Sequence, residues 1–193
     1  MSDDEVIEEI YRRFHSISAE IFSERIKALR MDDLPFKDVN GRTIDKIIHL
    51  IRGGDKSGAS FDIYRLGWCG GRVWELVIVD GVYLPHVHQK ISSEFFIFTG
   101  RGHVSHNDKW IAYRERTRIT VGIAVAHGFI TDPEFGPTTF LSIQSDPIRK
   151  ISIDPDTNSE KFEDDFVYVD DVFPLPLDLL NIRNRKLAAL GRA

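Results

Sequence analysis

The chain has 193 residues, a hydrophobic content of 42% and a formal net charge of −5 at pH 7, which fits one globular domain with attached segments. The acidic balance, without a basic cluster, argues against nucleic-acid binding, and no apolar run is long enough to span a membrane. The acidic N-terminus is unlike a secretory signal. The single cysteine, Cys69, excludes an internal disulfide framework, so we expect a cytoplasmic protein that handles a small molecule.

Residues 1–55 are predicted to form a helical extension. One long helix is expected from Ser2 to about Arg30, because Ser2 and Glu5 have the spacing of a capping box. Apolar residues recur through it at helical steps and form one stripe: Val6, Ile10, Phe14, Ile17, Ile21 and Leu29. The stripe must pack either on the rest of the chain or on a second subunit, and we expect a homodimer. A second, short helix is expected at residues 43–52.

Residues 56–153 are predicted to form an antiparallel β-sandwich or barrel. Short β-rich runs alternate here with Gly-Gly, Asp-Gly, Asn-Asp and Asp-Pro pairs, which are typical of turns. Helical patterns do not interrupt the runs, so the region is expected to be mainly β. The expected strands are Ser60–Leu66, Arg72–Val79, Tyr83–His88, Glu94–Thr99, Gly102–His106, Trp110–Arg114, Thr117–Val121, Ala124–Thr131 and Thr138–Ile143.

Residues 154–193 are predicted to contain an acidic loop and a helix that packs on the barrel. Eight acidic residues fall between Asp154 and Asp171, and such a stretch is usually solvated. The extended segment Pro174-Leu-Pro176 follows it. A C-terminal helix is then expected from about Leu177 to Leu190, with basic residues in its last turns.

Three histidines and a glutamate indicate a metal site. His86 and His88 lie two residues apart on an expected strand, so their side chains point to the same face, about 7 Å apart at the backbone. Imidazoles at this spacing can reach one metal ion at about 2.0–2.1 Å. Glu94 opens an apolar strand, where an unpaired charge would be costly, and His127 lies in a second apolar strand. Together they predict a centre with His86, His88, Glu94 and His127 as ligands.

This pattern resembles the two sequence motifs of the cupin superfamily, carried here by His86-X-His88, Glu94, the turn Gly100-Arg-Gly102 and Ala126-His127-Gly-Phe. The resemblance covers about half the chain and implies a double-stranded β-helix, the jelly-roll or cupin barrel. It also implies one divalent metal ion inside the barrel, held by the three histidines and Glu94. Such a ligand set suits Fe, Mn, Ni, Co or Zn.

Aromatic and polar residues around this centre are candidates for the substrate pocket: Tyr83, Phe96, Phe98, Tyr113, Phe129 and His103. Lys90 is a candidate catalytic residue that could bind an anionic group of the substrate. Glu94 is a second candidate, able to move a proton between substrate atoms.

Three functions remain open for a cupin of this kind. Five residues separate His88 from Glu94, and the resemblance to cupin isomerases with a distant glutamate implies a sugar or sugar-phosphate isomerase or epimerase. The alternative enzyme is an Fe(II)-dependent dioxygenase that uses the same four ligands. The third function is that of a non-catalytic ligand-binding cupin.

Overall fold

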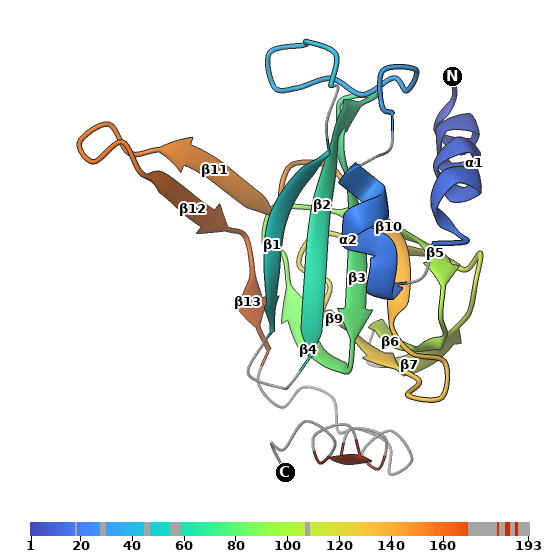
Figure 1. Cartoon of the computed structure of the whole chain (residues 1–193). Coiled ribbons are helices and arrows are strands. Elements are labelled where there is room, and N and C mark those ends of the chain that lie inside the picture. The colour runs from blue at the N-terminus through green and yellow to red at the C-terminus, as the bar shows by residue number, and fades with distance from the viewer. Residues whose placement is uncertain are drawn as a thin grey trace.

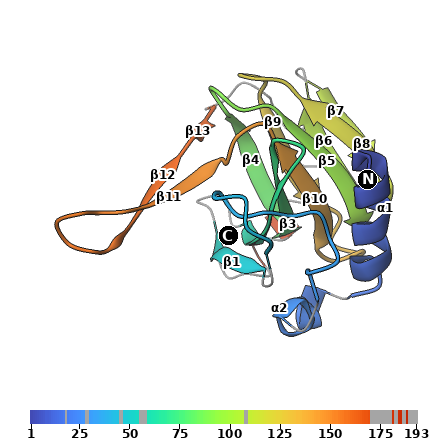
Figure 2. The same ribbon diagram turned by 90° about the horizontal axis from the view of Figure 1, so that it is seen from above.

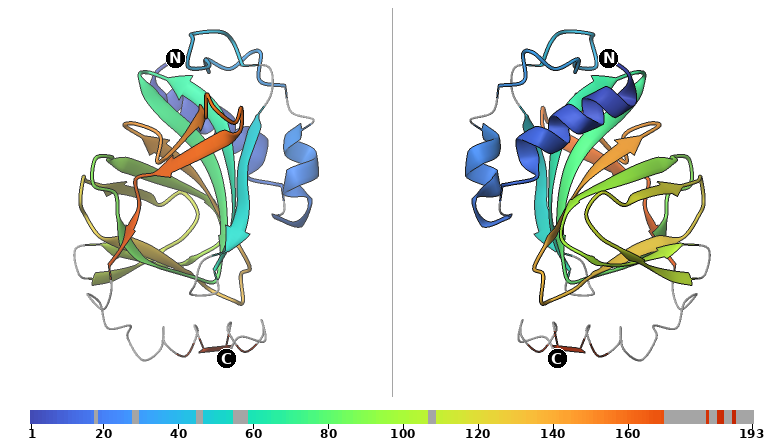
Figure 3. Two further views of the ribbon diagram at one scale, coloured as in Figure 1. Left: turned by 90° about the vertical axis from the view of Figure 1, so that its left-hand side faces the viewer. Right: turned by 90° about the vertical axis from the view of Figure 1, so that its right-hand side faces the viewer.

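The computed structural model describes residues 1–17, 19–27, 30–44, 47–54, 59–106 and 109–169, and the single positions 181, 184, 185 and 188. In the described residues the chain is mainly β, with two antiparallel sheets that face each other (Figures 1 and 3). The C-terminal helix predicted from Leu177 to Leu190 falls, apart from those four positions, outside the described residues.

Within the described residues, the first sheet, named sheet A, contains six strands in the order β1-β2-β3-β10-β5-β8. Their bounds are Ile48–Gly54 (β1), Ser60–Cys69 (β2), Arg72–Asp80 (β3), Ser93–Thr99 (β5), Arg118–Val121 (β8) and Thr138–Gln144 (β10). β1 is wrongly predicted as a short helix at residues 43–52. Its apolar, partly β-branched sequence pairs with β2 at the sheet edge instead, so the sheet begins within the predicted helical extension.

The second sheet, sheet B, has five strands among the described residues, in the order β13-β4-β9-β6-β7. They are Val82–Val87 (β4), Gly102–His106 (β6), Lys109–Tyr113 (β7), His127–Thr131 (β9) and Val167–Tyr168 (β13). β13 lies in the stretch predicted as a solvated acidic loop, yet it pairs with β4. The sheets of the barrel therefore extend beyond the predicted limit at Ile153.

Strands β11 (Arg149–Ile153) and β12 (Glu160–Asp164) form a separate two-stranded hairpin. Figure 2 shows this hairpin as an arm that projects from the two sheets. It also lies largely within the predicted acidic loop. The chain then returns from the end of the arm to sheet B, and this return brings residues 165–169 to the barrel.

The space between the sheets is filled by apolar side chains from both. Phe95, Ile97 and Phe140 of sheet A meet Val104 and Phe129 of sheet B in one buried cluster. We call this side of each sheet its interior face. The next residue along each strand points the opposite way, so Phe96, Phe98 and Leu141 lie on the outer face of sheet A in a different cluster.

The outer face of sheet A is covered by two helices, α1 (Asp3–Phe14) and α2 (Ala19–Lys27), rather than by the one long helix predicted. α1 begins with the predicted capping box between Ser2 and Glu5. The helix ends after Phe14, and α2 folds back so that the rings of Phe14 and Phe22 lie 5.8 Å apart. Of the predicted apolar stripe, Val6, Ile10 and Phe14 are buried in the cluster on this face and Ile17 packs partly against it, whereas Ile21 is 43% exposed. Leu29 lies outside the described residues. Tyr11 also packs on this face, where its ring contacts those of Phe96 and Phe98.

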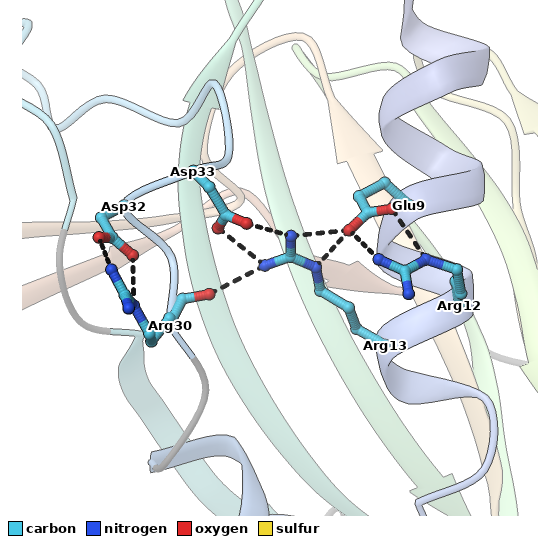
Figure 4. Close-up of polar contacts among 6 residues, drawn as sticks. All are labelled: Glu9, Arg12, Arg13, Arg30, Asp32 and Asp33. Atoms are coloured by element: carbon cyan, nitrogen blue, oxygen red, sulfur yellow. Dashed lines mark hydrogen bonds and ion pairs between the residues drawn. The ribbon is translucent and has the colours of Figure 1, made fainter.

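An ion pair joins α1 to the segment that follows α2. Figure 4 shows Arg13 between Glu9 and Asp33, with guanidinium–carboxylate distances of 2.7 and 2.6 Å. Hydrogen bonds from Arg12 and Arg13 lower the pKa of Glu9 to about 2.

Neither helix of the described residues is long and apolar enough to cross a membrane.

Candidate metal centre

Three histidines converge between the sheets. His86 and His127 are paired directly across β4 and β9, and His88 follows two residues after His86. Their ring centroids are separated by 4.3 to 5.0 Å, and one ligand nitrogen from each lies within 4.8 Å of the other two. All three residues are buried, with exposed fractions of 2, 4 and 1% for His86, His88 and His127. The structure therefore brings these three sequence-predicted residues together in one place.

Backbone carbonyls orient all three rings. The Nδ1 atom of His86 lies 2.9 Å from the oxygen of Leu84, and that of His127 lies 3.0 Å from the oxygen of Val125. The Nδ1 of His88 contacts the oxygen of Asp165. Because a carbonyl oxygen only accepts hydrogen bonds, each Nδ1 donates its proton, and each Nε2 keeps a lone pair. This is the form in which imidazole binds a metal ion.

Burial keeps the imidazoles neutral. Desolvation lowers the pKa of His86 well below its ordinary value, and the neighbouring His127 and His88 lower it further. Desolvation likewise lowers the pKa of His88, and it lowers that of His127 to about 3, with a contribution from His88. A metal ion would meet three unprotonated ligands at neutral pH, so its binding needs no deprotonation there.

A close approach of two strands sets the relative position of His86 and His127. The pairing of β4 with β9 is irregular between Tyr83 and His86, where Pro85 has no amide hydrogen to donate. Gly128 lies opposite this irregularity. A Cβ added to it would lie 2.6 Å from the backbone oxygen of Tyr83 and 2.8 Å from the nitrogen of Pro85. Only glycine fits there, beside the ligand His127.

Residues 165–169, which we call the strap, lie across the histidines. β13 of the strap pairs with β4 at Val87 and His86. The ring of Phe166 stacks on that of His86 with a centroid distance of 4.4 Å, and its centroid is 6.0 Å from that of His88. The carboxylate of Asp165 accepts hydrogen bonds from the backbone amides of Gln89 and Lys90, at 3.1 and 2.9 Å. The strap therefore both covers the cluster and holds the loop that follows His88.

Glu94 does not join the histidines, so its assignment as a ligand and proton shuttle is wrong. Its side chain points toward α1, on the same face of β5 as the side chains of Phe96 and Phe98. Its carboxylate binds Arg118, and it lies 3.6 Å from the guanidinium of Arg72. These arginines also bind Asp4 and Asp3 in the first turn of α1. Phe95 takes the interior position, with its ring 5.7 Å from that of His127, because side chains of adjacent strand residues point to opposite faces.

The other predicted site residues divide between the interior and elsewhere. Tyr83 lies at the site, with its ring 4.6 Å from that of His86. Phe129 lies in the interior core next to Phe95. Tyr113 is also interior, but its hydroxyl is bound to that of Thr138, at the end of β10 remote from Gln144.

Three predicted residues lie outside the centre. Phe96 and Phe98 pack under α1 on the outer face of sheet A. The side chain of His103 points away from the interior, because His103 is adjacent on β6 to the interior residue Val104. These assignments to the pocket are wrong for the same reason as that of Glu94.

Lys90 lies on the surface and lines an open groove at the base of the arm, together with Lys150, Asp146 and Asp165. Its backbone amide is bound by Asp165, and its side chain is exposed. This position does not support the predicted role of Lys90 as a catalytic residue that contacts a substrate at the histidines.

Asp165 and Phe166 contact the centre and were not foreseen from the sequence. The only signal for them is the apolar run Phe166-Val-Tyr within an otherwise acidic stretch, which is unusual for a solvated loop.

The three histidines offer three neutral nitrogen ligands, and no carboxylate of the described residues joins them. Imidazole ligands suit Zn, Fe, Ni and Cu, whereas Mn favours carboxylates, so the site fits a transition metal of the former kind.

No protein-family model matches the sequence, and no curated protein sequence matches it. Solved structures do match. A cupin 2 conserved barrel domain protein from Rhodopseudomonas palustris is 12% identical over 60% of this chain and 79% of its own, with a TM-score of 0.44. A predicted oxalate decarboxylase from Thermotoga maritima is 13% identical over 51% of this chain and 91% of its own, with a TM-score of 0.43.

DMSP lyase DddQ from Ruegeria pomeroyi DSS-3 is 17% identical over 44% of this chain, with a TM-score of 0.39, and the match spans 46% of that protein, less than half its length. The activities named are those of the proteins that carry the names. The two facing antiparallel sheets, with the three histidines between them, agree with the mainly β sandwich or barrel that the sequence predicts.

Proposed function

We propose that this protein binds one divalent transition-metal ion through His86, His88 and His127 and uses it in an enzymatic reaction on a small molecule. The observation that carries the proposal is the convergence of three buried imidazoles whose ligand nitrogens lie within 4.8 Å of one another. Burying three polar rings without a common partner is costly, and a shared metal ion offsets that cost. When bound, the ion supplies a Lewis acid that polarises a carbonyl or hydroxyl oxygen of the substrate.

The chain's own residues would orient and enclose the reaction. Carbonyls of Leu84, Val125 and Asp165 hold the three rings in place. Phe166 and Tyr83 flank His86 and keep water from that side of the centre, which strengthens electrostatic interactions inside it. Three neutral ligands leave the charge of the ion uncompensated, so it would polarise oxygen more strongly than with a carboxylate ligand present.

Metal titration of the tag-free protein tests this proposal. Co(II) absorption spectra should show one binding equivalent in the wild type, with affinity lowered at least about 100-fold in His86→Ala and His127→Ala. His103→Ala is the matched control, because His103 lies on the same sheet with its side chain directed away from the interior. A wild type that binds no metal ion, or binding that survives both substitutions, would refute the proposal.

Of the two reaction classes, we favour isomerisation or epimerisation of a sugar-like compound over oxygenation. The support is a set of buried polar side chains on the interior face of sheet A, at the same end as the histidines, which suits a hydroxylated substrate: Arg65, Glu75, Ser142 and Gln144. The Fe(II)-dependent dioxygenase is the second candidate, supported by an imidazole set that suits iron. Turnover under strict anaerobiosis favours the isomerase, and a requirement for oxygen favours the dioxygenase. Homodimer formation remains a prediction, which light scattering at micromolar concentration tests.

A further inference from the structure

Four buried polar side chains line the interior face of sheet A beside the histidines. Arg65 on β2 and Glu75 on β3 form an ion pair, with two guanidinium nitrogens 2.7 and 3.0 Å from one carboxylate oxygen. The amide nitrogen of Gln144 on β10 donates to the other carboxylate oxygen of Glu75 at 2.8 Å and to the hydroxyl of Ser142 at 3.0 Å. We call these four residues the polar wall. Their exposed fractions are 5% or less.

The strand register places the polar wall near the metal centre. Phe95, whose ring contacts that of His127, is paired with Ser142, and Ser142 is paired in turn with Glu75. These three residues therefore form one row across the interior face, with neighbouring strands about 4.8 Å apart. Gln144 is paired with Ser93, two residues before Phe95 on the same face of β5. The polar wall and the histidines thus lie at the same end of the barrel.

An unpartnered hydroxyl completes this surface. Ser93 is 3% exposed, and its Oγ is buried with no hydrogen-bond partner. A buried polar atom without a partner costs free energy, and native proteins rarely tolerate one unless water or a ligand satisfies it. Its position opposite Gln144 indicates that what satisfies it also meets the polar wall.

The remaining hydrogen-bonding capacity defines the chemistry of that ligand. Both hydrogens of the Gln144 amide are already donated, while its oxygen accepts, among the described residues, one hydrogen bond, from the backbone amide of Ile148. The Glu75 oxygen bound by Arg65 already accepts two hydrogen bonds, whereas the other Glu75 oxygen and the Gln144 oxygen each accept one and can accept another. A ligand hydroxyl can donate to these oxygens. A deprotonated carboxylate or phosphate group has no hydrogen to donate to these oxygens.

From these observations, and resting on the proposed function, we infer that Ser93 and the polar wall form a subsite for the hydroxyl groups of an uncharged polyol, such as a neutral monosaccharide. The histidine centre would hold the carbonyl end of the same molecule. Arg65 neutralises Glu75, so the subsite as a whole selects hydroxyl donors rather than an anion. Sugar phosphates, included in the broader sequence prediction, are the poorer substrates under this assignment.

Calorimetric titration of the metal-loaded protein with D-glucose, D-fructose, D-xylose and D-glucose 6-phosphate tests the subsite. At least one neutral sugar should bind, more tightly than D-glucose 6-phosphate. Ser93→Ala should weaken that binding by about threefold to tenfold, the effect of one hydrogen bond. Its metal affinity and fold should be retained, because the variant removes only an unpartnered hydroxyl.

Ser105→Ala is the matched control. Ser105 is also a fully buried serine with an unpartnered hydroxyl, but its side chain points away from the interior residue Val104. Its substitution should leave sugar binding unchanged. A loaded protein that binds none of the neutral sugars, that prefers D-glucose 6-phosphate, or that binds sugar equally well in Ser93→Ala overturns the subsite while leaving the metal centre intact. Failure to load metal would instead overturn the proposed function.

Discussion

The rings of Phe166 and His86 lie stacked, with centroids 4.4 Å apart and planes inclined by 26°. This contact joins the strap to the metal centre, because Phe166 lies one residue after Asp165, whose carbonyl accepts from His88. All three histidines are almost fully buried, so a molecule that reaches them from this side must displace the strap. The strap is therefore expected to control the rate at which metal and substrate enter.

Phe166→Ala should speed removal of the metal by a chelator. The variant loses the ring contacts with His86 and Tyr83, each of a kind that contributes about 0.5–1.5 kcal/mol, so local opening becomes easier. We expect chelator-driven loss of Co(II) to be about threefold to tenfold faster, measured by absorbance. Phe135→Ala, at an exposed phenylalanine, should release Co(II) at the wild-type rate. Equal rates for Phe166→Ala and wild type would show that the strap does not limit access.

Glu94→Gln should leave metal affinity unchanged and lower stability. The Glu94 carboxylate binds Arg118 and lies beside Arg72 on the α1 side of sheet A, which is the face opposite to the histidines. Loss of these charge-assisted contacts should reduce the free energy of unfolding by about 1–2 kcal/mol. Urea unfolding and metal titration of the same variant separate the two effects. A large loss of metal affinity at normal stability would restore Glu94 as a ligand.

Gly128→Ala should damage the metal centre through the backbone. The added Cβ would meet backbone atoms of Tyr83, Leu84 and Pro85 at 2.6 to 2.9 Å, so β4 must move away from β9 and carry His86 with it. We expect a loss of stability of about 1–3 kcal/mol together with weaker metal binding. Gly122→Ala is the control, because its Cβ would meet only a methyl group of Val125 at 3.4 Å. Wild-type behaviour of Gly128→Ala would contradict the described strand approach.

The metal-free protein should lose stability as the pH falls below about 6.5, the ordinary pKa of histidine. The folded protein keeps the buried histidines neutral, with the pKa of His127 lowered to about 3, whereas the unfolded chain protonates them. The unfolded state therefore binds more protons, and stability decreases between about pH 6.5 and pH 3, by up to ~1.4 kcal/mol per pH unit for each such histidine.

Urea unfolding at pH 7, 6 and 5 measures this dependence. Other titrating groups contribute to it as well, so the difference between wild type and His127→Gln isolates the contribution of one ligand. The variant should show a shallower loss of stability with falling pH. The histidines would have to be accessible to protons in the folded state if both proteins gave the same slope.

Period-two alternation predicts that His86 and His88 share a face, because it needs only the local sequence. The resemblance to the cupin motifs implies that His127 joins them, and the apolar strand around His127 supports that assignment. Glu94 could not be assigned in the same way. Whether it or Phe95 faces the interior depends on the register of β5 against β10 and β8, which involves residues far away in the sequence. The same error of one position in register leads to the wrong prediction that Phe96 and Phe98 line the pocket.

Long-range contacts also explain the other differences. The polar wall combines residues from position 65 to position 144, and Asp165 contacts His88 from 77 positions away. A local sequence pattern therefore predicts neither feature. The sequence predicts the apolar stripe of the first helix but not the turn after Phe14. It is stabilised by packing of Phe22 against both Phe14 and Tyr64 of β2.

X-ray absorption at the metal edge of the loaded protein tests the central claim most directly, because it reports the ligands of the ion itself. We expect scattering from three imidazoles with metal–nitrogen distances of about 2.0–2.1 Å for a zinc-like ion, unchanged in Glu94→Gln and reduced to two imidazoles or lost in His127→Ala. A spectrum with fewer than two imidazoles in the wild type, or one that changes in Glu94→Gln and not in His127→Ala, would contradict a centre built from His86, His88 and His127.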